Sequence, residues 1–278
     1  MSYQDGLRHV TMRQRWDRVA FLHWRYSSED VAAMLPEPIE VDRLDGDAWV
    51  SLVAFVRVVA PPRVLPPVPW LSIYLETHVR TYVRGPDGAR GLWFLSLDAD
   101  RLAAAVVGRQ MYGLPYRWSR LRLETAGDVV VYNTRLRRPR RRRVSSEVAV
   151  EVGEPIAADE LGAADRFLTG RERMYALGRR GLYAIDGEHE PWRLSRAKVL
   201  HLDDGLVAAT GLAAPEEAPL VHYCGGMEAR IGRRMPVTGR GVLPASEPSI
   251  LPRPLFPTAH LASTAASGAV RGGVCASR

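Results

Sequence analysis

Short segments rich in valine and other β-formers recur along this chain, separated by turn signals at intervals of roughly 8 to 12 residues. Residues 48–59 are dominated by valine, and residues 75–83 and 91–97 have a similar character. The last two segments flank Gly85-Pro86-Asp87-Gly88, residues 85–88, a composition typical of a tight turn. Because such residues suit a pleated surface, the pattern predicts an α+β fold that is mainly antiparallel β, either a sandwich or a barrel.

Helices are few in this pattern. The best candidate covers residues 100–112, where Asp98 or Asp100 can cap the first turn and Gly113 can end the last one. We expect the helices to pack outside the sheet or to close one of its ends. Shorter helices are expected over residues 28–35 and 157–168. Further strands are expected over residues 16–26, 119–124, 129–136, 146–152, 174–177, 181–185, 192–195, 198–202 and 206–209.

The length and the texture of the chain indicate one domain with a tail. Its 278 residues suit one large domain, and 46% hydrophobic residues suffice for a sizeable core. From Gly239 the sequence is rich in proline, alanine and serine and lacks periodicity, so we expect a domain over residues 1–238 and a disordered tail over 239–278. No apolar run approaches the roughly 18 residues of a membrane span, and residues 1–16 lack a signal-peptide stretch. The expected location is the cytoplasm.

Positive charge is concentrated in one short run. The net charge is +7, and residues 135–143 contain seven arginines. Such a run is either the solvated end of a hairpin or a patch that contacts a polyanion. It contains no aromatic residue that would stack on bases, so nucleic acid is not the expected partner.

Common cofactor and metal motifs are missing from the sequence. It contains no phosphate-binding G-x-x-x-x-G-K-[ST], no dinucleotide G-x-G-x-x-G and no G-x-S-x-G elbow. His189-Glu190 is followed by Pro191, which does not fit the zinc helix H-E-x-x-H. The seven histidines are scattered, so we expect no metal and no cofactor; Cys224 is expected to be a buried thiol.

Three segments resemble a known superfamily. Trp24-Arg25 precedes L-P-E-P-I-E-V-D (residues 35–42), and the first proline lies 11 positions after Arg25. Residues 74–83 read Y-L-E-T-H-V-R-T-Y-V, and residues 107–117 read V-G-R-Q-M-Y-G-L-P-Y-R. They resemble the acetoacetate decarboxylase-like superfamily, in its YqjF-like or DUF2071 branch. The resemblance covers roughly residues 15–236 and implies a cone-shaped antiparallel β-barrel with a deep central cavity and a few peripheral helices. Further matching pieces are residues 21–24, 45–50, 91–98 and 189–192.

The same resemblance shows a missing nucleophile. In the decarboxylase, the segment that resembles residues 107–117 ends in P-K-K. The first of these lysines attacks a ketone and forms an iminium that accepts electrons as carbon dioxide leaves. Here Tyr116 and Arg117 stand at the two lysine positions, and a tyrosine cannot form an iminium. The only lysine is Lys198, about 80 residues further along on an expected strand. The chain is therefore not expected to be a lysine-dependent acetoacetate decarboxylase.

The resemblance also assigns candidate site residues. Arg25 matches an arginine that meets the substrate carboxylate, and Glu76 matches a pocket acid. With Tyr116 as a hydrogen-bond donor to a carbonyl or enolate oxygen, these residues form the candidate catalytic set. The alternative is that Arg25 and Glu76 form a buried ion pair that only holds the sheet together. The candidate substrate-binding residues are Arg25, Arg117, Trp24 and Arg80.

The leading functional hypothesis is a protein that binds a small organic acid or a hydrophobic metabolite. If it is an enzyme, we expect enolisation, hydration or lyase chemistry that does not use a lysine. The alternative is a non-catalytic binding or interaction module, with the arginine run at 135–143 contacting a polyanion. A homo-oligomer is compatible with either hypothesis.

Overall fold

The described chain folds into one 12-stranded sheet with few helices. The computed structural model describes residues 7, 10–60, 72–137 and 144–237. The expected tail and residues 138–143 of the arginine run lie outside these ranges, so both expectations stay predictions. The strands are β1 (Val10–Tyr26), β2 (Glu40–Val41), β3 (Ala48–Ala60), β4 (Ile73–Arg84), β5 (Arg90–Ala99), β6 (Tyr116–Ala126), β7 (Val129–Leu136), β8 (Ser145–Pro155), β9 (Arg173–Gly178), β10 (Gly181–His189), β11 (Leu194–Asp204) and β12 (Leu220–Pro236).

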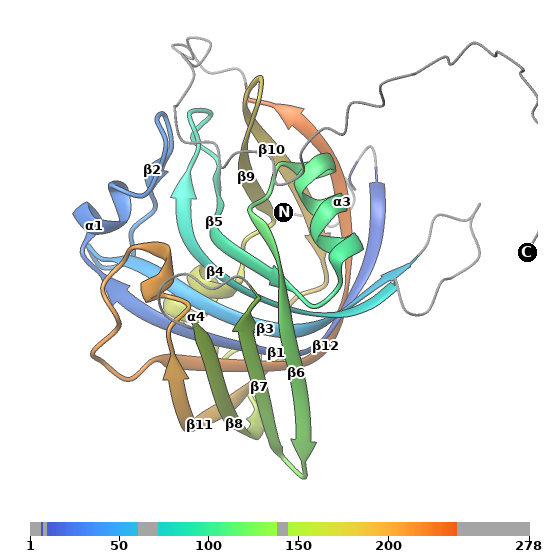
Figure 1. The fold of residues 1–278 in the computed structure, drawn as a ribbon. Helices are drawn as coiled ribbons and strands as arrows, with labels where there is room; N and C mark the ends of the chain where they lie inside the picture. Colours follow the sequence, from blue (N-terminus) through green and yellow to red (C-terminus); the bar gives the residue numbers. More distant parts are fainter. Residues whose placement is uncertain (1–6, 8–9, 61–71, 138–143, 238–278) are drawn as a thin grey trace, which may run out of the picture. The chain divides into compact units, whose positions relative to one another are not determined.

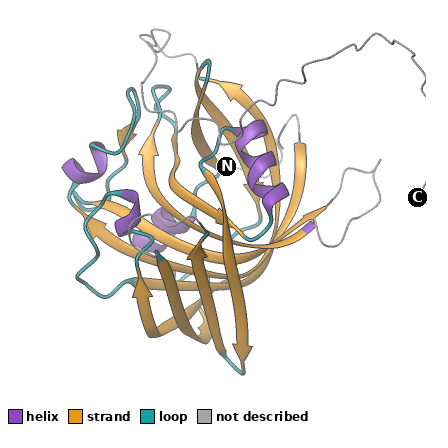
Figure 2. Ribbon diagram, viewed as in Figure 1, coloured by secondary structure: helices purple, strands orange, loops and turns teal. Residues whose placement is uncertain are grey.

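The sheet closes on itself. Its strand order is β10-β9-β5-β6-β7-β8-β11-β12-β1-β3-β4-β2, and additional pairings join β10 to β12 and β4 to β5. One closed circuit therefore runs through β6, β7, β8 and β11, while another runs through β9 and β10, and both share β12, β1, β3, β4 and β5 (Figure 1). The pairings are antiparallel except for β5 with β6 and with β9. The predicted fold, mainly antiparallel β with few helices, is confirmed (Figure 2).

One long strand was not predicted. β12 spans 17 residues and pairs with β1, β10 and β11, but glycines interrupt its pattern of β-forming residues. Gly226 lies so close to β1 that a Cβ there would come within 2.4 Å of the Asp17 carboxylate. Glycine weakens the strand pattern of β12 in the sequence, and at Gly226 it also allows β12 and β1 to approach closely. Residues 206–209 were wrongly expected to form a strand, since Ala208–Thr210 form a short 3₁₀ turn.

The helices are shorter than expected. Helix α1 (Ser28–Ala32) is capped by Ser27, whose side chain accepts from two backbone amides, and α4 (Ala163–Thr169) begins after Gly162. Helix α3 (Leu102–Tyr112) packs on β5 and β6 and ends at Gly113, which has a φ of +70°. The expected aspartate cap of α3 is wrong, because the Asp100 side chain accepts instead from the Leu75 amide at 3.0 Å. Among the helices of the described residues, none is long and apolar enough to cross a membrane.

The strands shared by the two circuits are buried on both faces. Leu22, Leu52 and Val79 face a core that also contains Val130 and Val150 from the strands of the β6–β11 circuit. Residues of the opposite parity point into the other circuit, where the space is incompletely filled. In β1 an irregularity between Asp17 and Ala20 shifts this alternation, so that Trp16 lines the same space as Val19 and Phe21. The period-two geometry of a strand thus divides each of β1, β3 and β4 into a core face and a cavity face.

Candidate functional site

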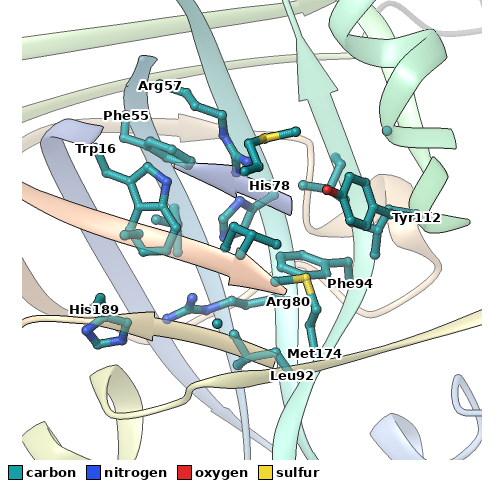
Figure 3. A pocket seen from close by; sticks show the side chains of 18 of the residues that line it. Trp16, Phe55, Arg57, His78, Arg80, Leu92, Phe94, Tyr112, Met174 and His189 are labelled. Atoms are coloured by element: carbon teal, nitrogen blue, oxygen red, sulfur yellow. The ribbon is translucent and has the colours of Figure 1, made fainter. Parts of the chain in front are cut away.

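A cavity of about 300 Å³ lies within the circuit that contains β9 and β10. Its wall comes from β1, β3, β4, β5, β6, β9, β10, β12 and α3, and most of the lining side chains are apolar or aromatic. Figure 3 shows Arg57, His78 and Arg80 pointing into this space, with Phe55 and Phe94 near the His78 ring. A mostly apolar cavity with a few converging polar groups is the usual form of a small-molecule site.

Strand β4 supplies a row of polar groups to this cavity. Tyr74, Glu76, His78 and Arg80 alternate with residues such as Val79 that face the filled core. Tyr74, His78 and Arg80 line the cavity, and Glu76 lies buried behind it. The row is visible in the sequence as Y-x-E-x-H-x-R over residues 74–80, although only Glu76 and Arg80 were singled out there.

Glu76 is a fully buried carboxylate with three donors. Arg57 Nη2 donates to Oε1 at 2.7 Å, the Tyr116 hydroxyl donates to Oε2 at 2.8 Å, and His78 Nδ1 lies 3.4 Å from Oε1. Burial raises the pKa of Glu76, but Arg57 and the hydrogen bonds from His78 and Tyr116 outweigh it and hold the pKa below its usual value. Glu76 is therefore ionised at neutral pH.

The cation paired with Glu76 is Arg57 of β3, which the sequence did not reveal. Arg57 Nη1 also donates to Gln14 Oε1 at 3.0 Å, and Trp16 Nε1 donates to the same oxygen at 2.8 Å. The buried ion pair considered from the sequence exists, but with Arg57 in place of Arg25. Arg57 lies opposite Tyr74 in the β3–β4 register, and Glu76 is two residues further along β4. The ion pair of Arg57 with Glu76 therefore follows from strand pairing and not from any local motif.

The structure does not bring Arg25 to Glu76 and Tyr116. Its side chain is more than half exposed, lies 3.7 Å from Asp47 and stacks over the Trp49 ring at 5.4 Å. The cavity face of β1 is formed by Trp16, Val19 and Phe21. Arg25 lies four residues beyond Phe21, or roughly 13 Å along the strand, which explains the misplacement.

Two other predicted binding residues also lie away from the cavity. The Trp24 indole donates to the Glu217 carbonyl at 3.1 Å within the filled core, and Arg117 donates from Nε to Asp98 at 2.9 Å. Neither lines the cavity. Trp24 faces the filled core because its parity along β1 is that of Leu22.

Tyr116 lies where the resemblance places the nucleophilic lysine. It is 5% exposed, and Gly108 of α3 packs against its ring so closely that a Cβ at Gly108 would come within 2.3 Å of Cδ2. Burial raises the pKa of Tyr116 well above its ordinary value of 10, so the phenol keeps its proton. Lys198 is exposed on β11, opposite Glu151, and does not line the cavity.

His78 is a neutral imidazole at neutral pH. Burial, together with Arg80 and Arg57, lowers its pKa to about 4 despite the nearby Glu76. Its ring packs edge-on against Phe55 and Phe94, with centroids 5.8 and 4.9 Å away. The buried Nε2 atom has no hydrogen-bond partner among the described residues.

Arg80 is a buried cation without a matching anion in the described part of the chain. It is 7% exposed, and Nη2 donates to the Leu168 carbonyl at 3.2 Å. Its Nε has no partner there, and no ion pair joins it to a described carboxylate. Two other arginines of the lining differ, because Arg171 pairs with Asp42 at 2.9 Å and Arg173 with Asp186 at 2.6 Å.

Aromatic side chains complete the lining. Trp16 and Trp192 stack with centroids 5.9 Å apart, and His189 lies 5.2 Å from Trp192. His189 and Trp192 belong to the H-E-P-W segment noted in the sequence, but nothing there indicated that they face a cavity. Within the described residues, no three histidine, cysteine, aspartate or glutamate side chains are grouped to hold a metal ion. Cys224 is buried, as expected.

Several solved structures have a similar fold at low sequence identity. Enduracididine biosynthesis enzyme MppR, complexed with the condensation product of pyruvate and imidazole 4-carboxaldehyde, aligns with a TM-score of 0.58 at 15% identity, over 84% of this chain and 91% of that one. A structure of acetoacetate decarboxylase aligns with a TM-score of 0.55 at 16% identity, over 80% and 88%. An acetoacetate decarboxylase-like enzyme from Sphingomonas wittichii RW1 gives 0.54 at 14%, over 81% and 92%. These likenesses show the fold.

Sequence comparison identifies the family. The uncharacterized protein YqjF of Bacillus subtilis (strain 168) is 34% identical over 227 residues, covering 80% of this chain and 90% of YqjF. The model of the DUF2071 family, described as an uncharacterized conserved protein, matches residues 13–228. With its closed, mainly antiparallel sheet and its acetoacetate decarboxylase-like structural neighbours, the chain belongs to the DUF2071 family.

Proposed function

We propose that the cavity binds a small carboxylic acid whose carboxylate pairs with Arg80. The observation that carries this proposal is the buried guanidinium of Arg80, which has no described carboxylate as partner. A buried unpaired charge is costly, and an anionic ligand would offset that cost with charge-assisted hydrogen bonds. The other guanidinium groups of the lining, those of Arg57, Arg171 and Arg173, already have carboxylate partners.

The rest of the ligand is expected to be small and largely apolar. A volume of about 300 Å³ lies at the lower end of the range for ligand pockets. Phe94, Leu92 and Met174 form the lining near Arg80 in Figure 3 and offer few polar contacts. A structure of MppR with a similar fold is complexed with pyruvate, a small oxo acid, which supports this class of ligand without identifying it.

Binding of this acid does not involve a Schiff base in our proposal. Tyr116 replaces the lysine and donates a hydrogen bond to Glu76 at 2.8 Å, and Lys198 is exposed outside the cavity. A neutral phenol beside an ionised carboxylate can orient a ligand and cannot form an iminium with it. The site therefore favours a ligand-binding barrel that does not use amine chemistry.

Titration with small mono-carboxylic acids tests the proposal. Binding of acetate, pyruvate, 2-oxobutyrate and butyrate is measured by calorimetry or ligand-observed NMR. Wild-type protein is expected to bind at least one of them, R80M is expected to weaken that binding at least tenfold, and R25M is the matched control with an exposed arginine. Unchanged binding by R80M, or no binding of any acid by the wild type, would contradict the proposal.

A further inference from the structure

We infer that His78 is a general base of this cavity, taking a proton through Nε2 from the carbon beside the carbonyl of a 2-oxo acid held by Arg80. The inference rests on the proposed acid-binding function and adds a reaction to it. His78 is 5% exposed, lines the cavity and has an Nε2 atom without a described partner. An unpaired ring nitrogen that is buried in a ligand cavity is a group placed to exchange a proton with the ligand.

The surroundings of His78 select the tautomer that leaves this lone pair free. Nδ1 lies 3.4 Å from Oε1 of Glu76, which is ionised and accepts only. Nδ1 therefore carries the proton and Nε2 carries the lone pair. A carboxylate on the far side of an imidazole fixes the ring and stabilises the imidazolium as it forms. Because Arg57 Nη2 holds the same Oε1 at 2.7 Å, the carboxylate is itself held in place.

Ligand binding makes His78 a stronger base. Arg80 is among the charges that lower the pKa of His78 in the empty cavity, after burial. A carboxylate paired with Arg80 offsets that positive charge, while Glu76 continues to favour the imidazolium. The acid thus raises the basicity of His78 when it occupies the site, and the imidazole remains neutral in the absence of ligand.

The spacing of His78 and Arg80 fits a short oxo acid. The two residues alternate on the cavity face of β4, so their backbones are about 6.6 Å apart along the strand. An acid with its carboxylate on Arg80 extends its chain along the strand toward His78. Oxygens of the carboxylate and the neighbouring carbonyl can share one planar guanidinium, since it presents parallel donors.

The reaction balances without any further reagent. His78 Nε2 forms a bond to hydrogen as the bond between that hydrogen and C3 breaks. The freed electron pair becomes the C2–C3 double bond, and the carbonyl electrons move to oxygen as an enolate charge beside the Arg80 guanidinium. Return of a proton from Nε2 to C3 restores the acid. In D₂O the ring N–H exchanges with solvent, so deuterium accumulates at C3.

Other titratable groups around the cavity are less suitable as the base. Glu76 has three donors and lies behind the wall, and Tyr116 holds its proton because burial raises its pKa far above neutrality. His23 and His222 also have unpartnered ring nitrogens but do not line the cavity. Three more acidic or histidine residues line the cavity. Glu172 is exposed, and Glu188 pairs with Arg230 at 3.0 Å. His189 Nδ1 lies 2.7 Å from the Glu190 carbonyl and not from a carboxylate. His78 is thus the imidazole of the described lining whose free lone pair is backed by an ionised carboxylate.

Deuterium exchange tests the inference. Pyruvate or 2-oxobutyrate is incubated with the protein in D₂O, and loss of the C3 proton signal is followed by ¹H NMR. H78N and H78Q are expected to lower the exchange rate about 100-fold or more while leaving acid affinity within about threefold. H201N, which changes an exposed histidine on β11, is expected to exchange at the wild-type rate. R80M is expected to lose binding and exchange together.

The outcomes separate the two proposals. If the wild type binds the acid but exchanges no deuterium, or if H78N and H78Q exchange normally, the role of His78 is wrong and the binding function stands. If no acid binds, both fail. Should both His78 variants fold poorly, ¹⁵N NMR of the wild type decides: Nε2 of His78 must have the shift of an unprotonated ring nitrogen at pH 7. A protonated Nε2 would overturn the inference.

Discussion

The Tyr116 hydroxyl donates a 2.8 Å hydrogen bond to Glu76, at the position where the decarboxylase resemblance places a nucleophilic lysine. Glu76 is ionised because Arg57 outweighs the effect of burial, and Tyr116 stays protonated because burial raises its pKa. Neither a phenol nor a carboxylate can form an iminium with a ketone. This pair therefore cannot carry the Schiff-base step of the decarboxylase.

Reductive trapping is expected to fail on this protein. Because the only lysine is exposed and lies outside the cavity, sodium borohydride added with pyruvate should leave the protein mass unchanged at levels that label a lysine-dependent enzyme. Intact-mass spectrometry followed by peptide mapping is the measurement. A stoichiometric adduct on Lys198 that acid ligands protect against would show that an amine reaches the site after all.

Removal of Arg57 is expected to destabilise the fold strongly. R57M leaves Glu76 buried without its cation, and breaking a buried pair in this way typically lowers the free energy of unfolding by about 3–5 kcal/mol. The double variant R57M/E76Q should lose less, since no charge remains unpaired. Urea unfolding at pH 7 measures both, with R25M as a control that should change stability by less than about 1 kcal/mol. If R57M and R25M lowered the free energy of unfolding equally, the ion pair of Arg57 and Glu76 would have no stabilising role.

Acid should destabilise the wild type more than a variant that lacks His78. The pKa of His78 is about 4 in the folded protein and 6.5 in an ordinary environment. Between these values the unfolded chain binds the proton and the folded chain does not, so stability falls as the pH falls through this window. From pH 7 to pH 5 this one group contributes a loss of about 2 kcal/mol. H78N should remove that part of the slope in urea unfolding, whereas parallel curves for both proteins would contradict the assigned shift.

The close contact between α3 and Tyr116 makes Gly108 intolerant of a side chain. G108A places a Cβ within 2.3 Å of the Tyr116 ring, so the ring or the helix must move. We expect a loss of about 1–3 kcal/mol of unfolding free energy and weaker acid binding, because the Tyr116–Glu76 hydrogen bond is disturbed. G225A is the matched control, since a Cβ at Gly225 meets nothing within 4 Å. A G108A protein as stable as G225A would show that the contact is not tight.

The sequence revealed the parts of this site that belong to short continuous segments of the chain. Glu76 and Arg80 belong to the alternating pattern of β4, and Tyr116 follows from its place after Leu114-Pro115 in a segment that resembles the superfamily. A mainly antiparallel sheet was also predictable, because β-forming segments and turns succeed one another along the chain, whereas its closure was an implication of the resemblance. These patterns are local, so they can be recognised without knowledge of which strands pair in the folded sheet.

The remainder of the site depends on strand register. Arg57 reaches Glu76 because β3 pairs with β4 in one register, and a single arginine in a valine-rich strand gives no indication of its partner. Arg25 was misplaced because matching an interval of residues does not show how far along β1 a side chain lies. His78 was not among the candidate residues, and its Nε2 can be judged only from the burial and contacts of the folded chain.

The most direct test of the central claim is a crystal structure of the protein with a bound 2-oxo acid such as 2-oxobutyrate. We predict that the acid carboxylate lies within hydrogen-bond distance of the Arg80 guanidinium, with C3 of the acid facing Nε2 of His78. An acid bound outside the cavity, or one whose carboxylate pairs with Arg25 or Arg117 while Arg80 has no anionic partner, would contradict it.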